Sequence, residues 1–136
     1  SGVRMTIDLR NPGDAAMTAA EAHLAEFVAE LPGRYGVAGV LERMAKTLVR
    51  EFDPGVQALL AATADDLGLP YVITMSGAGH DAQEIAATCP TAMVFVAGEY
   101  GGVSHTPREY SNPTACGNGV DLLANAIYRL ASQPAG

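Results

Sequence analysis

Helix signals and short apolar runs alternate along the chain from Asp53 onward, and this alternation constrains the fold more than any other feature. Asp53-Pro54 is typical of a helix start, with a capping side chain followed by proline. Apolar runs at 71–75 and 92–97 predict two short strands, the second buried on both faces, and 81–88 predicts a short helix between them. The last helix carries an apolar stripe formed by Cys116, Val120, Leu123, Ile127 and Leu130. The order helix, strand, helix, strand, helix predicts an α/β layered unit with a parallel strand pair.

The first part of the chain has a different pattern. Residues 3–9 alternate apolar and polar side chains, which predicts a half-buried strand that ends at Arg10. A turn at 11–14 leads into a predicted amphipathic helix that stops at Pro32-Gly33. The apolar face of this helix contains Leu24, Phe27, Val28 and Leu31, and His23 is expected on its surface.

Residues 36–49 fit two structures. Their apolar positions match a helical stripe, but two glycines favour a twisted strand, and we predict a strand. A break in composition near Arg50 then separates the chain into two regions, 1–49 and 50–136. A chain of 136 residues is long enough for one core and too short for two ordinary domains.

The charge and composition exclude several classes of partner. The net charge is −7 and the eight basic residues are scattered, so neither nucleic acid nor an anionic membrane is an expected partner. No apolar run reaches the roughly 18 to 20 residues of a membrane span. We therefore expect a soluble cytoplasmic protein that binds small molecules or proteins. Cys89 and Cys116 lie far apart without a CxxC pair, which predicts reduced thiols that serve as small buried apolar residues.

Two glycine-rich loops each carry one histidine. His80 lies in SGAGHDA and His105 in GGVSHTPRE, each after a predicted strand. Ligands collect beyond the carboxyl ends of strands in open α/β sheets, so the two histidines could meet in one site. For His80 two interpretations stay open: it caps the next helix in a tight turn, or the loop and the helix N-H groups cradle a carboxylate or an oxyanion.

His105 and Arg10 have functional interpretations as well. His105 could bind a metal ion, oriented by Ser104, Thr106 or Glu109, but it cannot hold one alone, and the sequence has no HExxH, HxH or cysteine pair. Arg10 is either a solvated residue or a clamp for a carboxylate, for which its planar guanidinium is well shaped.

Three segments together resemble one enzyme family. SGAGHDAQ, CPTAMVFV and GGVSHTPREY are similar, in order and spacing, to the amidase/hydantoinase/carbamoylase family of zinc-dependent amidohydrolases, and VRMTIDLRNP resembles the lid-domain strand of that family. The resemblance implies an α/β zinc-exopeptidase-like catalytic domain with an inserted α+β lid that also makes the dimer. It further implies that residues 1–49 are the second half of the lid/dimerisation domain. Residues 50–136 would then be the C-terminal portion of the catalytic domain.

The resemblance also assigns roles to single residues. His105 looks like the last ligand of a two-metal centre, with Glu109 supporting it, and the metal would be zinc, with manganese or cobalt as alternatives. His80 looks like the residue that polarises the scissile carbonyl or stabilises its oxyanion, with a backbone N-H contact from Gly79. Arg10 looks like the clamp on the substrate carboxylate. The implied substrates are N-carbamoyl amino acids or related ureido and amide compounds.

The departures from the family matter equally. The family's other metal ligands and its catalytic glutamate precede the part that the resemblance covers, so we expect this chain alone to bind zinc weakly and to be inactive. VAGEYGG replaces the more usual VPSxxG, which places Glu99 and Tyr100 near the mouth of the implied site. Unpaired strand edges predict a homo-oligomer. Two alternatives stay open: an aminoacylase or dipeptidase relative, or a non-catalytic dimerisation or ligand-binding module.

Overall fold

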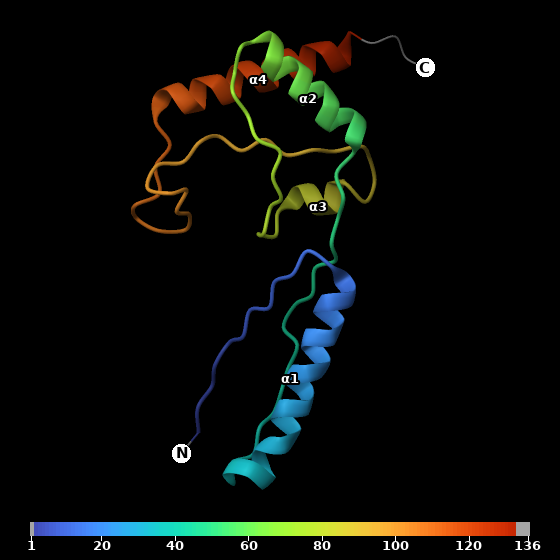
Figure 1. Ribbon diagram of the computed structural model, residues 1–136, viewed down its shortest axis with the longest axis vertical. Coiled ribbons are helices and arrows are strands. Elements are labelled where there is room, and N and C mark those ends of the chain that lie inside the picture. Colours follow the sequence, from blue (N-terminus) through green and yellow to red (C-terminus); the bar gives the residue numbers. More distant parts are fainter. Residues whose placement is uncertain (1, 133–136) are drawn as a thin grey trace. The chain divides into compact units, whose positions relative to one another are not determined.

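The computed structural model describes residues 2–132, and Figure 1 shows these residues as helices joined by irregular segments. The helices are α1 (Asp14–Tyr35), α2 (Pro54–Asp66), α3 (Asp81–Ile85) and α4 (Pro113–Ala131). The chain divides into two compact units. The first unit runs to Arg50 and adds Met75–Gly79, and the second takes Glu51–Thr74 and the chain from His80 onward.

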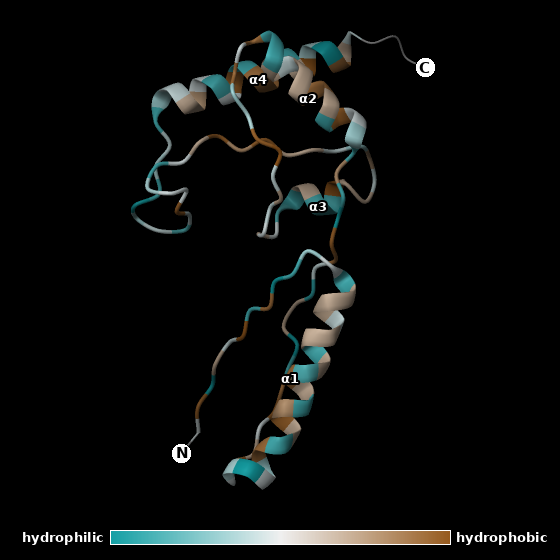
Figure 2. Cartoon of the chain, viewed as in Figure 1, coloured by the Kyte–Doolittle hydropathy of each residue, from teal (hydrophilic) through white to brown (hydrophobic). Residues whose placement is uncertain are grey.

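No strand is present among residues 2–132, so the predicted strands are wrong for this structure. A strand exists only when its backbone bonds to a neighbouring strand, and no such pairing occurs within the described residues. Most apolar side chains of these segments are therefore uncovered: Val3 is 87% exposed, Val72 83% and Phe95 58%, whereas Leu9, Met93 and Val94 are half-buried. Figure 2 shows apolar residues in the middle of the irregular segment between α3 and α4, and mainly hydrophilic or neutral residues in the loop that leads to α4. The irregular segments are residues 3–9, 36–49, 71–75 and 92–97.

Helix α1 forms where the sequence predicts it and is half-buried along one side. Gly13 precedes it, and the Gly13 N-H donates to the Asn11 side chain at 2.9 Å, which fixes the predicted turn. The half-buried side includes three of the four predicted apolar residues, whereas Phe27 is 46% exposed. His23 is exposed, as predicted. The three half-buried residues are Leu24, Val28 and Leu31.

The predicted end of α1 is wrong. The helix continues through Pro32 to Tyr35 and ends at Gly36, which has a left-handed φ of 65°. The Gly36 N-H donates to the Pro32 carbonyl at 3.1 Å. A proline removes one helical hydrogen bond through its missing N-H, and here the loss falls near the last turn, where the glycine cap terminates the helix.

The segment after α1 runs back along it in the first unit (Figure 1). A Cβ atom on Gly39 would lie 2.9 Å from both Val28 and Leu31, so glycine allows the close approach at this point. Near the other end, the Val49 N-H donates to the Asp14 carboxylate at 3.1 Å. Between these contacts the Glu21 carboxylate pairs with the cations of Arg43 and Lys46. The segment after α1 is thus held in place by contacts with this helix and not by pairing with a strand.

In the second unit, α2 packs against α4. Helix α2 begins as predicted, because the Asp53 carboxylate accepts from the Val56 N-H at 2.8 Å. The most buried side chains are small ones, Thr63 at 0%, Ala64 at 2% and Ala126 at 3% exposure. Arg129 of α4 also pairs with Asp66 of α2 at 2.6 Å.

The buried face of α4 differs from the predicted stripe. The predicted residues are open to solvent, with Val120 66% and Ile127 62% exposed. A neighbouring stripe, displaced by one residue, contains the buried positions Gly119 and Ala126 instead. Close packing selects small side chains, whereas the sequence pattern draws attention to large ones. The more buried stripe is Ala115, Gly119, Leu122, Ala126 and Arg129.

The cysteines are also not where we predicted. Cys89 and Cys116 are free thiols, but both are exposed. Cys116 belongs to the uncovered stripe of α4, and Cys89 follows α3, where its thiol lies 3.7 Å from the Thr91 hydroxyl. Of the helices within residues 2–132, none combines the length and apolar character needed to cross a membrane.

Candidate functional site

His80 caps the N-terminus of α3. Its Nδ1 accepts from the Ala82 N-H at 3.0 Å, and its own N-H donates to the Gln83 side-chain oxygen at 3.0 Å. The backbone of His80 is extended, with φ −153° and ψ 149°, as at an ordinary N-cap. The capping interpretation of this residue is confirmed. Capping uses only one imidazole nitrogen, so it does not exclude the chemical interpretation.

The proposed cradle of backbone N-H groups is only partly available. The Ala82 N-H binds the His80 ring, and the Gln83 N-H donates to the His80 carbonyl at 2.9 Å. These two donors therefore cannot bind an anion without breaking the cap. Within the glycine-rich loop, the Ser76 hydroxyl accepts from the Ala78 N-H at 3.3 Å and donates to the Ala78 carbonyl at 3.0 Å. The substrate contact that the family resemblance implies for the Gly79 N-H stays a prediction.

Arg10 is exposed but engaged. Its Nε and Nη2 atoms donate to one oxygen of Asp8 at 3.0 and 2.7 Å, and Nη1 donates to the Gly77 carbonyl at 3.1 Å. The hydrogen bond from Arg10 lowers the pKa of Asp8, and the same pairing raises the pKa of Arg10. The guanidinium is thus anchored to the glycine-rich loop three residues before His80 in the chain. A substrate carboxylate would compete with Asp8 or use the remaining N-H groups.

His105 has a strained backbone that Glu109 supports. The φ of His105 is +57°, a left-handed value that is unusual for a residue with a side chain. Glu109 accepts from the His105 N-H at 2.7 Å through one oxygen and from the Ser104 hydroxyl at 3.0 Å through the other. Glu109 therefore acts on the backbone of His105 and not on its imidazole, which has no hydrogen-bond partner among residues 2–132.

The loop that carries His105 is closed by contacts that the sequence did not reveal. The Glu99 N-H donates to the Tyr110 carbonyl at 2.8 Å, and the Asn112 amide donates to the Glu99 carboxylate at 2.9 Å. Tyr100 sits in a turn with φ +54°, and the Arg108 guanidinium lies 5.2 Å from the centre of its ring. The unusual residues Glu99 and Tyr100 thus stabilise the loop.

The described residues do not fit a metal site by themselves. His105 offers one imidazole, whereas no group of three or more His, Cys, Asp or Glu side chains in residues 2–132 could hold a metal ion. A catalytic zinc ion takes about three protein ligands. The expected meeting of His80 and His105 is also without support from hydrogen bonding, since each loop is held by its own contacts.

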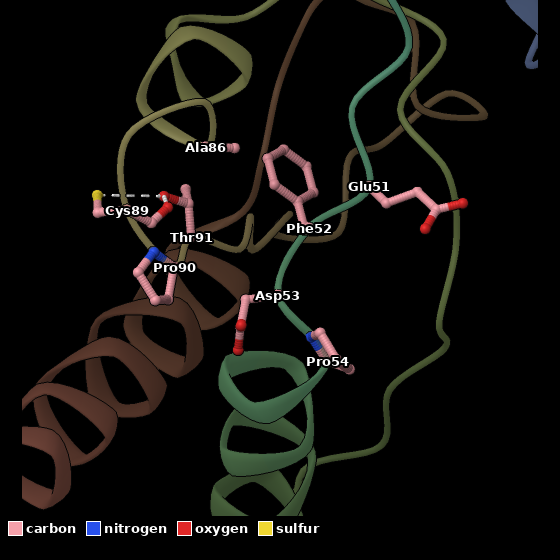
Figure 3. A pocket seen from close by; sticks show the side chains of 8 residues that line it. All are labelled: Glu51, Phe52, Asp53, Pro54, Ala86, Cys89, Pro90 and Thr91. Carbon is pink, nitrogen blue, oxygen red and sulfur yellow. Dashed lines mark hydrogen bonds between the residues drawn. The ribbon is translucent and has the colours of Figure 1, made fainter.

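A hollow of about 340 Å³ lies elsewhere in the second unit (Figure 3). Its polar groups already serve the fold: the Asp53 carboxylate caps α2, and the Asp53 N-H donates to the Thr91 carbonyl at 2.9 Å. None of the predicted site residues lines it. The hollow therefore adds no chemistry to the candidate site. Its lining is Glu51, Phe52, Asp53, Pro54, Ala86, Cys89, Pro90 and Thr91.

Proteins similar to this chain include named amidohydrolases. Residues 8–129 match the family described as Peptidase family M20/M25/M40. An allantoate amidohydrolase of Bacillus subtilis is 30% identical over 129 residues, covering 95% of this chain and 31% of the relative. An N-carbamoyl-L-amino-acid amidohydrolase of Rhizobium meliloti is likewise 30% identical over 95% of this chain and 31% of its own length.

Solved structures agree with these relatives. An amidase of the hydantoinase/carbamoylase family from Burkholderia vietnamiensis matches with a TM-score of 0.83 and 33% identity, over 91% of this chain and 30% of that one. The resemblance predicted from the loop motifs is confirmed, and the likeness supports an α/β zinc-exopeptidase-like fold. The chain spans about three tenths of the length of the relatives it matches.

Proposed function

Because the chain belongs to the peptidase family M20/M25/M40, we propose that it forms part of an amidohydrolase that cleaves the C-N bond of N-carbamoyl amino acids or of ureido compounds such as allantoate. Relatives with these two named activities match nearly the whole chain. The observation that carries the proposal is the capped His80, whose Nε2 has no acceptor in the described part of the chain and could donate to a carbonyl oxygen.

We further propose that residues 1–49 belong to a lid/dimerisation domain and 50–136 to a catalytic domain. The boundary near Arg50 between the two compact units supports this division. The uncovered apolar segments support pairing with polypeptide outside this chain, either a longer enzyme or a second copy. We also propose that the protein is cytoplasmic and forms a homo-oligomer.

The chemistry of this chain's own residues is substrate binding and charge stabilisation. His80 Nε2-H would donate to the carbonyl oxygen of the scissile amide, and that bond would strengthen as the oxygen gains negative charge. The Gly79 N-H would add a second donor. Arg10, anchored to Gly77, would bind the substrate carboxylate.

His105 would contribute one ligand to a metal centre, which we propose to hold zinc, with manganese or cobalt as alternatives. The peptidase family M20/M25/M40 is generally metal-dependent. Since the described residues offer no group of three ligands, further ligands must come from other polypeptide. We therefore propose that this chain alone binds zinc weakly and does not hydrolyse these substrates.

Two observations favour a second candidate function. The exposed stripe of α4 and the uncovered strand-like segments would suit a non-catalytic module that acts by association. An aminoacylase or dipeptidase activity is the remaining enzymatic alternative, and assays with acyl amino acids and dipeptides separate it from a carbamoylase.

A chimera tests the proposal. This chain replaces the matching 31% of the Bacillus subtilis relative, and hydrolysis of allantoate and N-carbamoyl amino acids is measured together with bound zinc. We expect an active chimera that loses zinc on His105→Ala but keeps it on His80→Asn, because asparagine still caps a helix but lacks the imidazole. Stoichiometric, tight zinc on the 136-residue chain alone would contradict the shared site.

A further inference from the structure

The cap of α3 uses a side chain that is seldom chosen for this purpose. Serine, threonine, aspartate and asparagine are the favoured N-caps, and each would satisfy the Ala82 N-H with a smaller group. His80 fills the position instead, with its Nδ1 3.0 Å from that nitrogen. A histidine here is explained if its second ring nitrogen has a task that the smaller caps cannot perform.

The cap determines which ring nitrogen carries the proton. Since Nδ1 accepts a hydrogen bond from a backbone N-H, it carries no proton itself, and the single ring proton of the neutral imidazole lies on Nε2. Nε2 is then a donor without a lone pair in the ring plane. No protein group within residues 2–132 accepts from it, so it is available to a ligand.

Gln83 makes the second hydrogen bond of the cap, to the backbone of His80. Its side-chain oxygen accepts the His80 backbone N-H at 3.0 Å and holds His80 in the extended conformation from which Nδ1 reaches the Ala82 N-H. Helix α3 has only five residues, so few other bonds define its start. The ring position therefore depends on Gln83, although this side chain does not touch the ring.

We propose that Gln83 is a positioning residue that, with the Ala82 N-H, fixes His80 in the Nε2-H tautomer, so that His80 donates a hydrogen bond to a substrate carbonyl and does not act as a general base. The proposal rests on the proposed amidohydrolase function. The group recognised at Nε2 is an acceptor, such as the oxygen of an amide or ureido carbonyl. A base at this position would need the lone pair that this tautomer lacks.

Nitrogen NMR on the ¹⁵N-histidine-labelled chain tests the tautomer directly. We expect long-range ¹H-¹⁵N correlations that identify Nδ1 of His80 as unprotonated and Nε2 as protonated. Gln83→Ala should mix the two tautomers, while Gln83→Glu, which keeps an acceptor oxygen, should retain the wild-type pattern. Gln57→Ala is the matched control, because this glutamine lies on α2, where its side chain donates to the Phe52 carbonyl. A wild-type spectrum with the proton on Nδ1, or a Gln83→Ala spectrum unchanged from wild type, would overturn the proposal.

Kinetics of the chimera provide the second readout. Gln83→Ala should lower kcat about tenfold with little change in KM, because the lost contact matters most in the transition state, and Gln83→Glu should recover most of the rate. A rate unaffected by Gln83→Ala despite mixed tautomers would overturn the positioning role. A chimera with the expected tautomer but no hydrolysis of any tested substrate would instead contradict the proposed function and support the tautomer assignment.

Discussion

Glu109 holds the backbone of His105 in a left-handed conformation: its carboxylate accepts from the His105 N-H at 2.7 Å, where φ is +57°. The second carboxylate oxygen accepts from the Ser104 hydroxyl at 3.0 Å, so both oxygens are committed to the loop. A left-handed residue with a side chain costs about 1 to 2 kcal/mol. A hydrogen bond to a charged group offsets a cost of this size.

Removing this carboxylate should release the loop. Glu109→Ala is expected to shift His105 toward negative φ, which the coupling between its amide and α protons reports. Glu109→Gln keeps an acceptor oxygen and should preserve most of the wild-type value. If Glu109→Ala leaves the coupling unchanged, the carboxylate does not hold this conformation, and the turn at Tyr100 and the Glu99-Tyr110 bond must suffice.

The start of a helix was predictable from the sequence. Whether another segment covers an apolar run was not. Asp53-Pro54 gave the start of α2 correctly, because capping depends on neighbours within three residues. The segment 92–97 has the composition of a buried strand but no strand beside it within the described residues. Strand pairing depends on distant polypeptide, so an apolar run cannot reveal whether its partner is present.

In the candidate site, too, some features were predictable from the sequence and others were not. His80 and His105 were found from their glycine-rich loops, and the comparisons support the family that those loops suggest. The bond from Arg10 to Gly77 spans 67 residues, and no local pattern predicts it. The support of His105 through its backbone was also missed, because spacing alone does not show whether a carboxylate contacts a ring or an N-H.

Glycines within α4 should respond differently to alanine. A Cβ on Gly119 would collide with the Val96 Cγ1, a stiff β-branched side chain, whereas a Cβ on Gly117 meets nothing within 4 Å. Gly119→Ala should destabilise the fold by about 1 to 3 kcal/mol through overpacking. Gly117→Ala should stabilise it by up to about 1 kcal/mol through helix propensity. Urea unfolding of both variants tests the contact, and equal effects would contradict it.

The Asp8-Arg10 pair should titrate in the acid range. Arg10 lowers the pKa of Asp8, so any stabilisation from the pair is present above the unfolded pKa of about 3.9 and is lost as pH falls through the lower folded value. We expect Arg10→Gln to raise the pKa of Asp8 toward its ordinary value in a carboxyl ¹³C titration. Arg34→Gln, which removes a cation paired with Glu30 on α1, is the control and should leave Asp8 unchanged. Identical midpoints for Asp8 in Arg10→Gln and wild type would argue against the pairing.

The two stripes of α4 can be distinguished by introducing charge. Val120 and Ile127 are 66% and 62% exposed, so glutamate at either position should change the free energy of unfolding by no more than about 0.5 kcal/mol. Ala126 is 3% exposed, and Ala126→Glu would bury an unpaired carboxylate at a cost of several kcal/mol.

Light scattering on the same variants tests self-association: if copies of the chain meet through the exposed stripe, Val120→Glu and Ile127→Glu should shift the population toward monomer. A large loss of stability in both variants at low protein concentration would instead mean that the predicted stripe, and not its neighbour, forms the core.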